Sequence, residues 1–357
     1  MDKLQTRSHR AWRRVGKVGR GLVVALVVLG AAGAMWNYLA VHHDRKANPP
    51  PGRIYDVNGH AMHLYCTGTG SPTLVLESGH GEDFTVWGKV QPALSLVTRT
   101  CSYDRAGFGW SEVQPGARDA EHIADQLHAL LLKAGITSPI VLMGHSGGGL
   151  YAHVYASRFR QSTAGLVLVD AFPSTPLPKP AFSTALDHHT NVEFAFVKAT
   201  VALGIARLVG QCDSIPEGLG AYAGWIKANE CYYPQLDVYV REDRALDDSR
   251  EQGTHAGPFG NLPILILSQD PKQPIPAFLS KRVTPEDWLW QSTAHDQEQA
   301  AYLQLSTNSR RVIAEKSGHY IQYDRPDVLI RETTTLIQQI RDDDTGGPWV
   351  ANKPSQL

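Results

Sequence analysis

The sequence has almost no net charge, −1 at pH 7, and only four cysteines among 357 residues. Its charges are unevenly distributed: residues 1–20 contain seven basic residues and one acidic residue, whereas the remainder contains 27 basic and 34 acidic residues. The part after residue 20 has no basic surplus of the kind that binds nucleic acid, so we expect no nucleic-acid partner. Its 42% hydrophobic and 19% charged residues are typical of a globular protein with a sizeable core.

Internal repeats and metal-ligand spacings are also missing. His42, His43 and Asp44 follow one another, but no further ligand lies at the spacing of a metal site, so we interpret them as part of a solvated linker. We expect neither a metal ion nor an organic cofactor.

One segment, residues 21–41 (GLVVALVVLGAAGAMWNYLAV), contains no charged residue and is long enough to cross a bilayer as a helix. The basic residues 1–20 before it, and Trp36 and Tyr38 near its far end, predict a single membrane anchor with a cytoplasmic tail. The rest of the chain would then be periplasmic or extracellular. The small residues 32–34 also resemble a signal-peptide cleavage site, so a protein secreted after cleavage near Ala34 is the alternative.

Export makes the four cysteines informative, because an even number in an oxidising compartment suggests disulfides. Cys212 and Cys231 lie close together in one region, and Cys66 and Cys101 are the other two. The sequence allows three ways of pairing them, and four buried free thiols are the alternative.

Strand and helix patterns alternate after a linker at residues 42–52, whose prolines cannot continue a helix. Two short strands joined by Asn58-Gly59 predict a tight hairpin. A helical pattern ends at Gly135, and the last helix begins at Pro326. Apolar runs typical of strands buried on both faces cover residues 73–79, 138–144, 163–170 and 262–268. This alternation predicts an α/β fold with a mostly parallel sheet.

Two stretches interrupt the alternation. Residues 173–260 contain apolar helical patterns with almost no strand signal, which predicts a helical insertion. Residues 342–357 are charged and rich in Pro and Gly, and we expect a disordered tail there.

Gly144-His145-Ser146-Gly147-Gly148 matches the pattern G-x-S-x-G, between a strand and a helix. Glycines suit this position because the serine stands on a strained turn where side chains would collide with the neighbouring strand and helix. The Ser146 hydroxyl would project into a site, and the N–H of Gly147 would point at a developing oxyanion. The pattern predicts Ser146 as a nucleophile, with a simple glycine-rich turn as the alternative.

A serine hydroxyl needs a base, which is expected late in the chain when the serine comes first. Residues 310–326 (RRVIAEKSGHYIQYDRP) contain His319 on a loop between a strand and the last helix. We therefore predict His319 as the base, whereas His145 is expected to pack beside its strand.

These features together resemble the α/β-hydrolase fold superfamily, from about Gly52 to Arg341. Residues 74–87 (LVLESGHGEDFTVW) are similar to the strand and oxyanion loop of that family. Residues 101–111 (CSYDRAGFGWS) are similar to its D-x-R-G-x-G-x-S loop. The resemblance implies a central sheet with helices on both faces.

The resemblance also implies the domain organisation and several pairings. Residues 53–172 and 261–341 would form the core, and residues 173–260 a helical cap. The strands of Cys66 and Cys101 would be neighbours, which favours that disulfide, and Cys212 with Cys231 would staple the cap. The backbone N–H of His80 would be the second oxyanion donor, although the family more usually has a His-Gly pair there.

Two aspartates could complete a catalytic triad by orienting the imidazole of His319. Asp270 follows the next-to-last strand, the commoner location in the family, although the turn SQDP is short. Asp170 ends the strand GLVLVD, where some relatives have their acid. We predict Asp270 as the acid, with Asp170 as the alternative.

A carboxylate in place of Ser146 would have indicated dehalogenase or epoxide hydrolase chemistry by analogy with the family. Serine predicts acyl transfer to Ser146 and then to water. We expect a hydrolase acting on a small-molecule acyl substrate, most simply a carboxylic ester. A peptidase or carbon–carbon hydrolase could use the same triad, and a binding protein without turnover is the non-enzyme alternative.

Overall fold

The alternating patterns fold into one eight-stranded sheet. The computed structural model describes residues 2–178, 191–276, 281 and 283–344. The strands are β1 (Arg53–Val57), β2 (His60–Thr67), β3 (Thr73–Glu77), β4 (Thr100–Tyr103), β5 (Ile140–His145), β6 (Thr163–Val169), β7 (Ile264–Gln269) and β8 (Ser309–Ala314).

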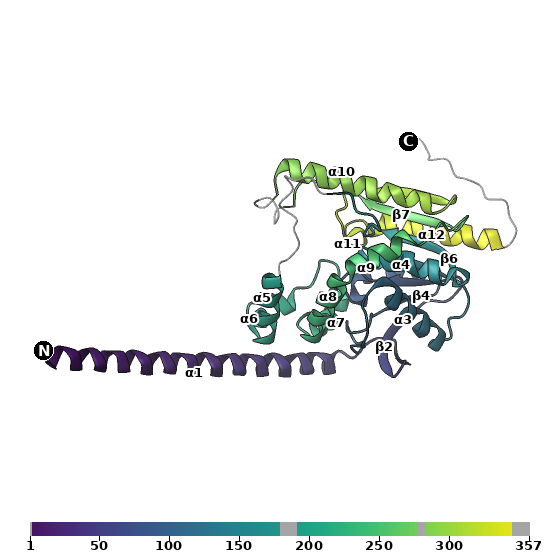
Figure 1. Cartoon of the computed structure of the whole chain (residues 1–357). Helices are drawn as coiled ribbons and strands as arrows, with labels where there is room; N and C mark the ends of the chain where they lie inside the picture. Colours follow the sequence, from purple (N-terminus) through teal and green to yellow (C-terminus); the bar gives the residue numbers. More distant parts are fainter. Residues whose placement is uncertain (1, 179–190, 277–280, 282, 345–357) are drawn as a thin grey trace. The chain divides into compact units, whose positions relative to one another are not determined.

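The helices follow the strands along the chain (Figure 1). The α-helices are α1 (Asp2–Ala47), α2 (Gln91–Leu94), α3 (Ala120–Lys133), α4 (Gly147–Arg158), α5 (Asn191–Ala202), α6 (Ile205–Leu208), α7 (Ala223–Glu230), α8 (Pro234–Arg244), α9 (Leu246–Thr254), α10 (Pro285–Ala301), α11 (Ile321–Asp324) and α12 (Pro326–Asp344). The 3-10 helices are η1 (Phe84–Trp87), η2 (Arg160–Ser162), η3 (Gln211–Asp213), η4 (Gly220–Tyr222) and η5 (Tyr302–Leu305).

The strand order is β1-β2-β4-β3-β5-β6-β7-β8. Strand β2 is antiparallel to both β1 and β4, and the other neighbouring pairs are parallel, as the sequence predicts. The hairpin between β1 and β2 turns at Asn58 and Gly59, which have φ values of 57° and 84°. Cys66 lies opposite Cys101 across β2 and β4, and the two form a disulfide, as the resemblance implies.

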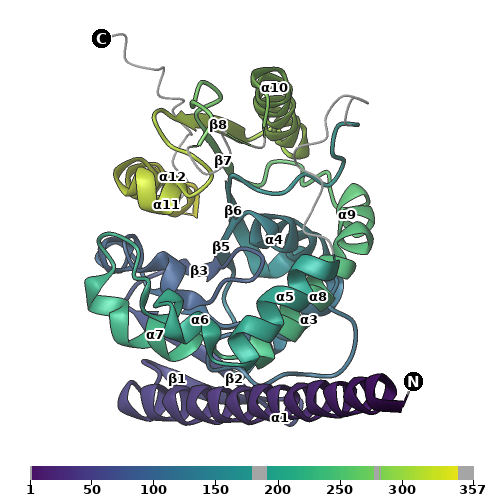
Figure 2. The same cartoon turned by 90° about the vertical axis from the view of Figure 1, so that its left-hand side faces the viewer.

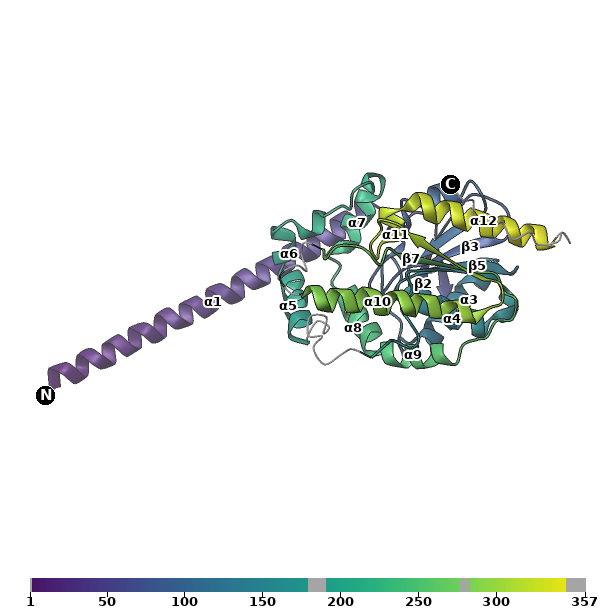
Figure 3. The same ribbon diagram turned by 90° about the horizontal axis from the view of Figure 1, so that it is seen from above.

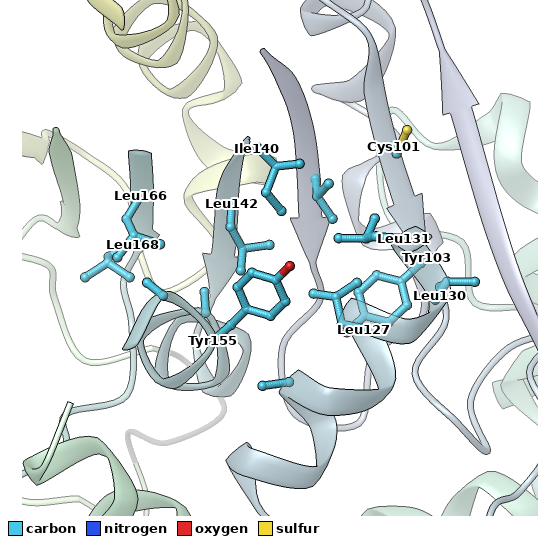
Figure 4. Packing of buried hydrophobic residues seen from close by; sticks show 14 of the residues in the cluster. Cys101, Tyr103, Leu127, Leu130, Leu131, Ile140, Leu142, Tyr155, Leu166 and Leu168 are labelled. Carbon is cyan, nitrogen blue, oxygen red and sulfur yellow. The ribbon is translucent and has the colours of Figure 1, made fainter. Parts of the chain in front are cut away.

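Successive residues of each central strand point to opposite faces of the sheet, and both faces are buried. On β5, Ile140 and Leu142 pack with residues of α3 and α4, as Figure 4 shows. Val141 and Met143 pack on the other face with residues of α12. Figure 2 shows α11 and α12 on one side of the sheet and α4 on the other. Burial on both faces explains why the central strands are almost entirely apolar.

Helix α1 forms a compact unit with described residues of the segments 191–216 and 223–233. Figures 1 and 3 show α5, α6 and α7 along the C-terminal part of α1. The guanidinium of Arg207 donates to Asp44 at 2.8 Å and to Asn37 at 3.2 Å. Cys212 and Cys231 form the second disulfide, within this unit. Residues 17–47 form a helix long and apolar enough to cross a membrane.

The structure corrects two of the predicted boundaries. Residues 42–47, assigned to the linker 42–52, continue α1, because proline first occurs at Pro49 and because Arg45 donates to Asn229 at 2.7 Å. Helix α12 continues to Asp344, three residues beyond the predicted end of the core. The remaining tail residues, 345–357, lie outside the described part.

The predicted cap contains α5 to α9, but it is not a single unit. Residues 217–222 and 234–260 belong to the same compact unit as the sheet, whereas 191–216 and 223–233 belong with α1. Helices α8 and α9 therefore belong to the unit that contains the sheet.

Leu142→Ala tests the packing of β5 against α3 and α4. Leu142 is fully buried, so its truncation should lower the free energy of unfolding by about 2–5 kcal/mol. Leu132→Ala is the matched control, because Leu132 is 51% exposed and should change stability by less than about 1 kcal/mol. Denaturant titrations of both variants in the same detergent measure the difference, and equal losses would contradict this packing.

Candidate active site

Most of the predicted site residues lie at the edge of the sheet where the parallel strands have their carboxyl ends. Ser146 follows β5, Asp170 follows β6, Asp270 follows β7, and His319 lies on the loop after β8. In open α/β sheets this edge is where ligands bind.

The turn at Ser146 has the strained backbone that the sequence predicts. Ser146 has φ 54° and ψ −123°, in a region that non-glycine residues rarely adopt. A Cβ atom on Gly144 would lie 2.2 Å from the carbonyl oxygen of Gly148. A Cβ atom on Gly148 would lie 2.4 Å from the carbonyl oxygen of Ser78. Both glycines are therefore needed for the close approach of strand, turn and helix.

A continuous chain of hydrogen bonds joins Ser146, His319 and Asp170. His319 Nε2 lies 2.9 Å from Ser146 Oγ, and His319 Nδ1 lies 2.6 Å from Asp170 Oδ2. A carboxylate only accepts, so Nδ1 carries the proton and Nε2 accepts from the serine hydroxyl. The side chain of His319 is 36% exposed, whereas that of Asp170 is fully buried.

The structure brings Asp170, and not the predicted Asp270, to His319. The carboxylate of Asp270 accepts from the N–H groups of Lys272 and Lys316, both at 2.9 Å. It therefore joins the short turn after β7 to the loop that carries His319. Asp170 itself has φ 45°, a left-handed conformation that non-glycine residues rarely adopt.

Asp170 has further partners that sequence analysis missed. Its Oδ1 accepts from the N–H of Gln269 at 2.9 Å and lies 2.8 Å from Nε2 of His295, on α10. Burial by itself would raise the pKa of Asp170, but His295 and His319 outweigh burial and hold this pKa below its usual value. His295 lies 125 residues from Asp170, and no local pattern marks it.

The two predicted oxyanion donors lie close together. The nitrogen of His80 is 3.4 Å from the position that a Cβ atom on Gly147 would occupy. Gly147 is the first residue of α4, so its N–H has no acceptor within the helix. The ring of His80 is stacked on that of Tyr239 of α8, with centroids 4.2 Å apart.

The backbone before His80 is held by Arg105, a residue of the D-x-R-G-x-G-x-S-like loop. The buried guanidinium donates to the carbonyl oxygens of Ser78 and Gly79, the latter at 2.8 Å. It also forms ion pairs with Glu77 at 2.9 Å and with Glu242 of α8 at 3.1 Å. These contacts fix the loop that carries the His80 N–H.

The imidazole of His145 contacts Glu82 and the backbone of His319. Its Nδ1 lies 3.1 Å from Glu82 Oε2, and its Nε2 lies 3.1 Å from the carbonyl oxygen of His319. Both partners are acceptors when Glu82 is ionised, so the imidazole then carries two protons. Burial would lower the pKa of His145, but Glu82 outweighs burial and raises it above the usual value of 6.5.

The same ion pair lowers the pKa of the Glu82 carboxyl group. Burial would raise the pKa of Glu82, but His145 lowers it below the usual value of 4.5. The charged His145–Glu82 pair thus holds the backbone of His319 through the hydrogen bond from His145 to the carbonyl oxygen of His319. Within the described ranges, no three His, Cys, Asp or Glu side chains are placed to hold one metal ion.

Comparison with known proteins relates the chain to one fold. Residues 72–205 match the family model of the alpha/beta hydrolase fold. An uncharacterized protein of Schizosaccharomyces pombe is 27% identical over 190 residues, 45% of this chain and 36% of that protein. The chain spans half or less of the length of the first curated relatives it matches.

Two solved structures extend the likeness to most of the chain. A putative lipase from Acinetobacter baumannii has a TM-score of 0.56 and 18% identity, covering 86% of this chain and 97% of its own. A haloalkane dehalogenase variant from Bradyrhizobium elkanii has a TM-score of 0.58 and 17% identity, covering 82% and 98%. At such identities the likeness shows the fold alone.

The coupling between His145 and Glu82 should depend on pH. The raised pKa of His145 gives stability that is complete below pH 6.5 and lost as pH rises through its folded value. The lowered pKa of Glu82 gives stability that is present above pH 4.5 and lost as pH falls through its folded value. The coupling energy, about 1–3 kcal/mol, should therefore be largest between these two pH values.

A double-mutant cycle with His145→Gln, Glu82→Gln and both together, measured by unfolding at pH 5.5 and pH 9, gives this coupling. The cycle of His122→Gln with Asp119→Asn is the control, because the side chain of His122 is 56% exposed. Although Asp119 is buried, His122 is open to solvent, so this pair should show a coupling below about 1 kcal/mol. A His145–Glu82 coupling that is the same at both pH values would contradict the charged pair.

Proposed function

We propose that the chain is a serine hydrolase of the α/β-hydrolase fold that cleaves carboxylic esters, since residues 72–205 match the family model of that fold. The observation that carries this proposal is the hydrogen-bonded chain from Ser146 through His319 to the buried Asp170. Ser146 is the nucleophile, His319 the general base and Asp170 the acid that orients it.

The first half of the reaction forms an acyl-enzyme. Ser146 Oγ attacks the acyl carbon while its proton passes to Nε2 of His319. Asp170 keeps Nδ1 protonated and stabilises the imidazolium. The N–H groups of Gly147 and His80 donate to the oxyanion of the tetrahedral intermediate. The imidazolium then protonates the leaving alcohol.

The second half of the reaction repeats these roles with water. His319 removes a proton from a water molecule, which attacks the acyl group bound to Ser146. Proton transfer back to Ser146 releases the acid. The contacts of Arg105 and of the His145–Glu82 pair support this cycle by keeping the His80 and His319 backbones in position.

The nucleophile favours acyl chemistry over the other reactions of this fold. The structural neighbours include both a putative lipase and a haloalkane dehalogenase variant, so the fold by itself does not select the reaction. A serine at the turn forms an acyl ester that water can cleave. This residue type supports acyl transfer as the reaction of this chain.

The same proposal assigns residues 21–41 to a membrane anchor that is not cleaved. A Cβ atom on Gly33 would lie 2.2 Å from the carbonyl oxygen of Leu203, so this part of α1 is packed within its unit. Cleavage near Ala34 would remove that contact. The basic residues 1–20 and the two disulfides favour a hydrolase domain outside the cytoplasm.

A fluorophosphonate probe tests the nucleophile. The full chain should be labelled, and Ser146→Ala should abolish labelling, because the phosphonate is attacked by an activated serine. Ser292→Ala, on the exposed side of α10, is the control and should label like the unsubstituted chain. Labelling of Ser146→Ala would exclude Ser146 as the nucleophile. No labelling of the unsubstituted chain would favour a binding protein without turnover.

Asp170→Asn and Asp270→Asn separate the two candidate acids. Asparagine at 170 favours the wrong imidazole tautomer and should lower kcat for ester hydrolysis about 10³- to 10⁴-fold. Asp270→Asn should change kcat by less than about tenfold, because the Asp270 carboxylate accepts from the backbone N–H groups of Lys272 and Lys316.

Esters of increasing chain length are the substrates for this comparison, together with an aminoacyl amide and a diketone. Hydrolysis of the amide or the diketone without any ester hydrolysis would replace the ester assignment by a peptidase or a carbon–carbon hydrolase. A larger effect of Asp270→Asn would reverse the choice of acid.

A further inference from the structure

The apolar segment of α1 is covered along one side by other helices of its own unit. Residues from Lys17 to Leu29 are exposed, but a stripe on the following turns is buried or half-buried. The stripe consists of Gly30, Gly33, Ala34, Asn37, Ala40, Val41 and Asp44. Gly33 approaches the backbone of Leu203, and Asn37 Nδ2 donates to the carbonyl oxygen of Val201 at 3.1 Å. The end of α5 and the turn into α6 therefore contact α1 inside residues 21–41.

The exposed part of α1 before this contact is too short to cross a bilayer. Residues 17–29 span about 20 Å at 1.5 Å per residue, whereas the hydrocarbon layer is about 30 Å thick. The span cannot move toward the N-terminus, because Lys17 and Arg20 would enter the hydrocarbon. A membrane-spanning α1 must therefore include the residues that contact α5 and α6.

The outer surface of α5 and α6 matches such a location. Every exposed residue from Ala195 to Gly210 is uncharged and apolar: Ala195, Phe196, Val197, Ala199, Leu203, Ile205, Leu208, Val209 and Gly210. Phe196 is 70% exposed and Leu208 is 74% exposed.

The two charged residues of the same stretch are turned to partners within the unit. Arg207 is buried and paired with Asp44. The ammonium group of Lys198 lies over the ring of Tyr233, 5.7 Å from its centroid. Because both charged residues are engaged by partners within the unit, the exposed residues from Ala195 to Gly210 are all uncharged.

We propose that α5 and α6 lie in the lipid of the leaflet that contains the C-terminal half of the α1 span. The partner of this surface is the bilayer itself, because the surface is continuous with an apolar segment that must lie in lipid. A large exposed apolar surface marks a membrane or protein interaction site, and an apolar face opposite the charged residues is typical of helices that lie at a membrane. The inference rests on the proposed anchor, and the test below separates the two.

Spin labels on single cysteines measure the environment of each position. The four native cysteines are paired, so an introduced cysteine is the only free thiol. The full chain is reconstituted in vesicles of phosphatidylethanolamine and phosphatidylglycerol, and its accessibility to oxygen and to a nickel chelate is measured. Phe196→Cys and Val209→Cys report on α5 and α6. Val24→Cys reports on α1, and Leu96→Cys, at a position 89% exposed, is the aqueous reference.

The ratio of oxygen to nickel accessibility should be several-fold higher at Phe196, Val209 and Val24 than at Leu96. A high ratio at Val24, with ratios at Phe196 and Val209 as low as that at Leu96, would overturn the inference but leave the proposed anchor unchanged. Low accessibility to both reagents at Phe196 and Val209 would mean coverage by protein, such as a second copy, and would also overturn it. A ratio at Val24 as low as that at Leu96 would overturn both the anchor and the inference.

Leu208→Glu provides a second test that needs no label. A carboxylate on this surface should be expelled from the hydrocarbon, so oxygen accessibility at Phe196→Cys should fall in the combined variant. Leu96→Glu is the matched control and should leave it unchanged. An unchanged accessibility in the Leu208→Glu variant, with its circular dichroism preserved, would contradict the lipid location.

Discussion

The hydrogen bond between His319 Nδ1 and the buried Asp170 is the interaction on which the arrangement of the candidate site depends. It fixes both the orientation of the imidazole and its tautomer, and so leaves a lone pair on Nε2 for the hydroxyl of Ser146. Asp170 remains ionised at full burial because three donors surround its carboxylate, namely Gln269, His295 and His319. The strained backbone at both Ser146 and Asp170 brings these side chains to one point above the ends of neighbouring strands.

A second set of buried charges supports the backbone around this point. Burying an ion pair costs more free energy than its attraction returns unless the geometry is well matched, so such pairs are poor evidence for stability. Arg105 satisfies this condition, since it is paired with two carboxylates and also donates to the loop before His80. The His145–Glu82 pair contacts the carbonyl oxygen of His319. Both sets hold main-chain segments in place, and positioning is the role that best accounts for their burial.

The N-terminal helix is part of a folded unit and not only a tether. Gly30 and Gly33 allow α1 to approach the region of Leu203 closely, which is how small residues act at helix contacts within membranes. Farther along α1, Asn37 and Asp44 bind Arg207, so the polar contacts of the unit lie on its inner side. The proposed lipid location of α5 and α6 follows from this division between an apolar outer surface and a polar inner one.

Local patterns were enough to predict most strands, helices α3, α4 and α12, and the turn at Ser146, because each depends on periodicity and glycine placement over a few residues. Strand β4 followed from the resemblance, and helix α10 was not predicted. The position of His319 followed from chain order and the resemblance. The choice between Asp170 and Asp270 did not, because both follow a strand and only the backbone angle at Asp170 and its donors from distant segments distinguish them. His295 and Glu82 were missed for the same reason, and residues 42–47 became helical because Arg207 and Asn229 bind them. These features are determined by contacts between residues that are far apart in the chain. No short stretch of sequence contains both partners of such a contact.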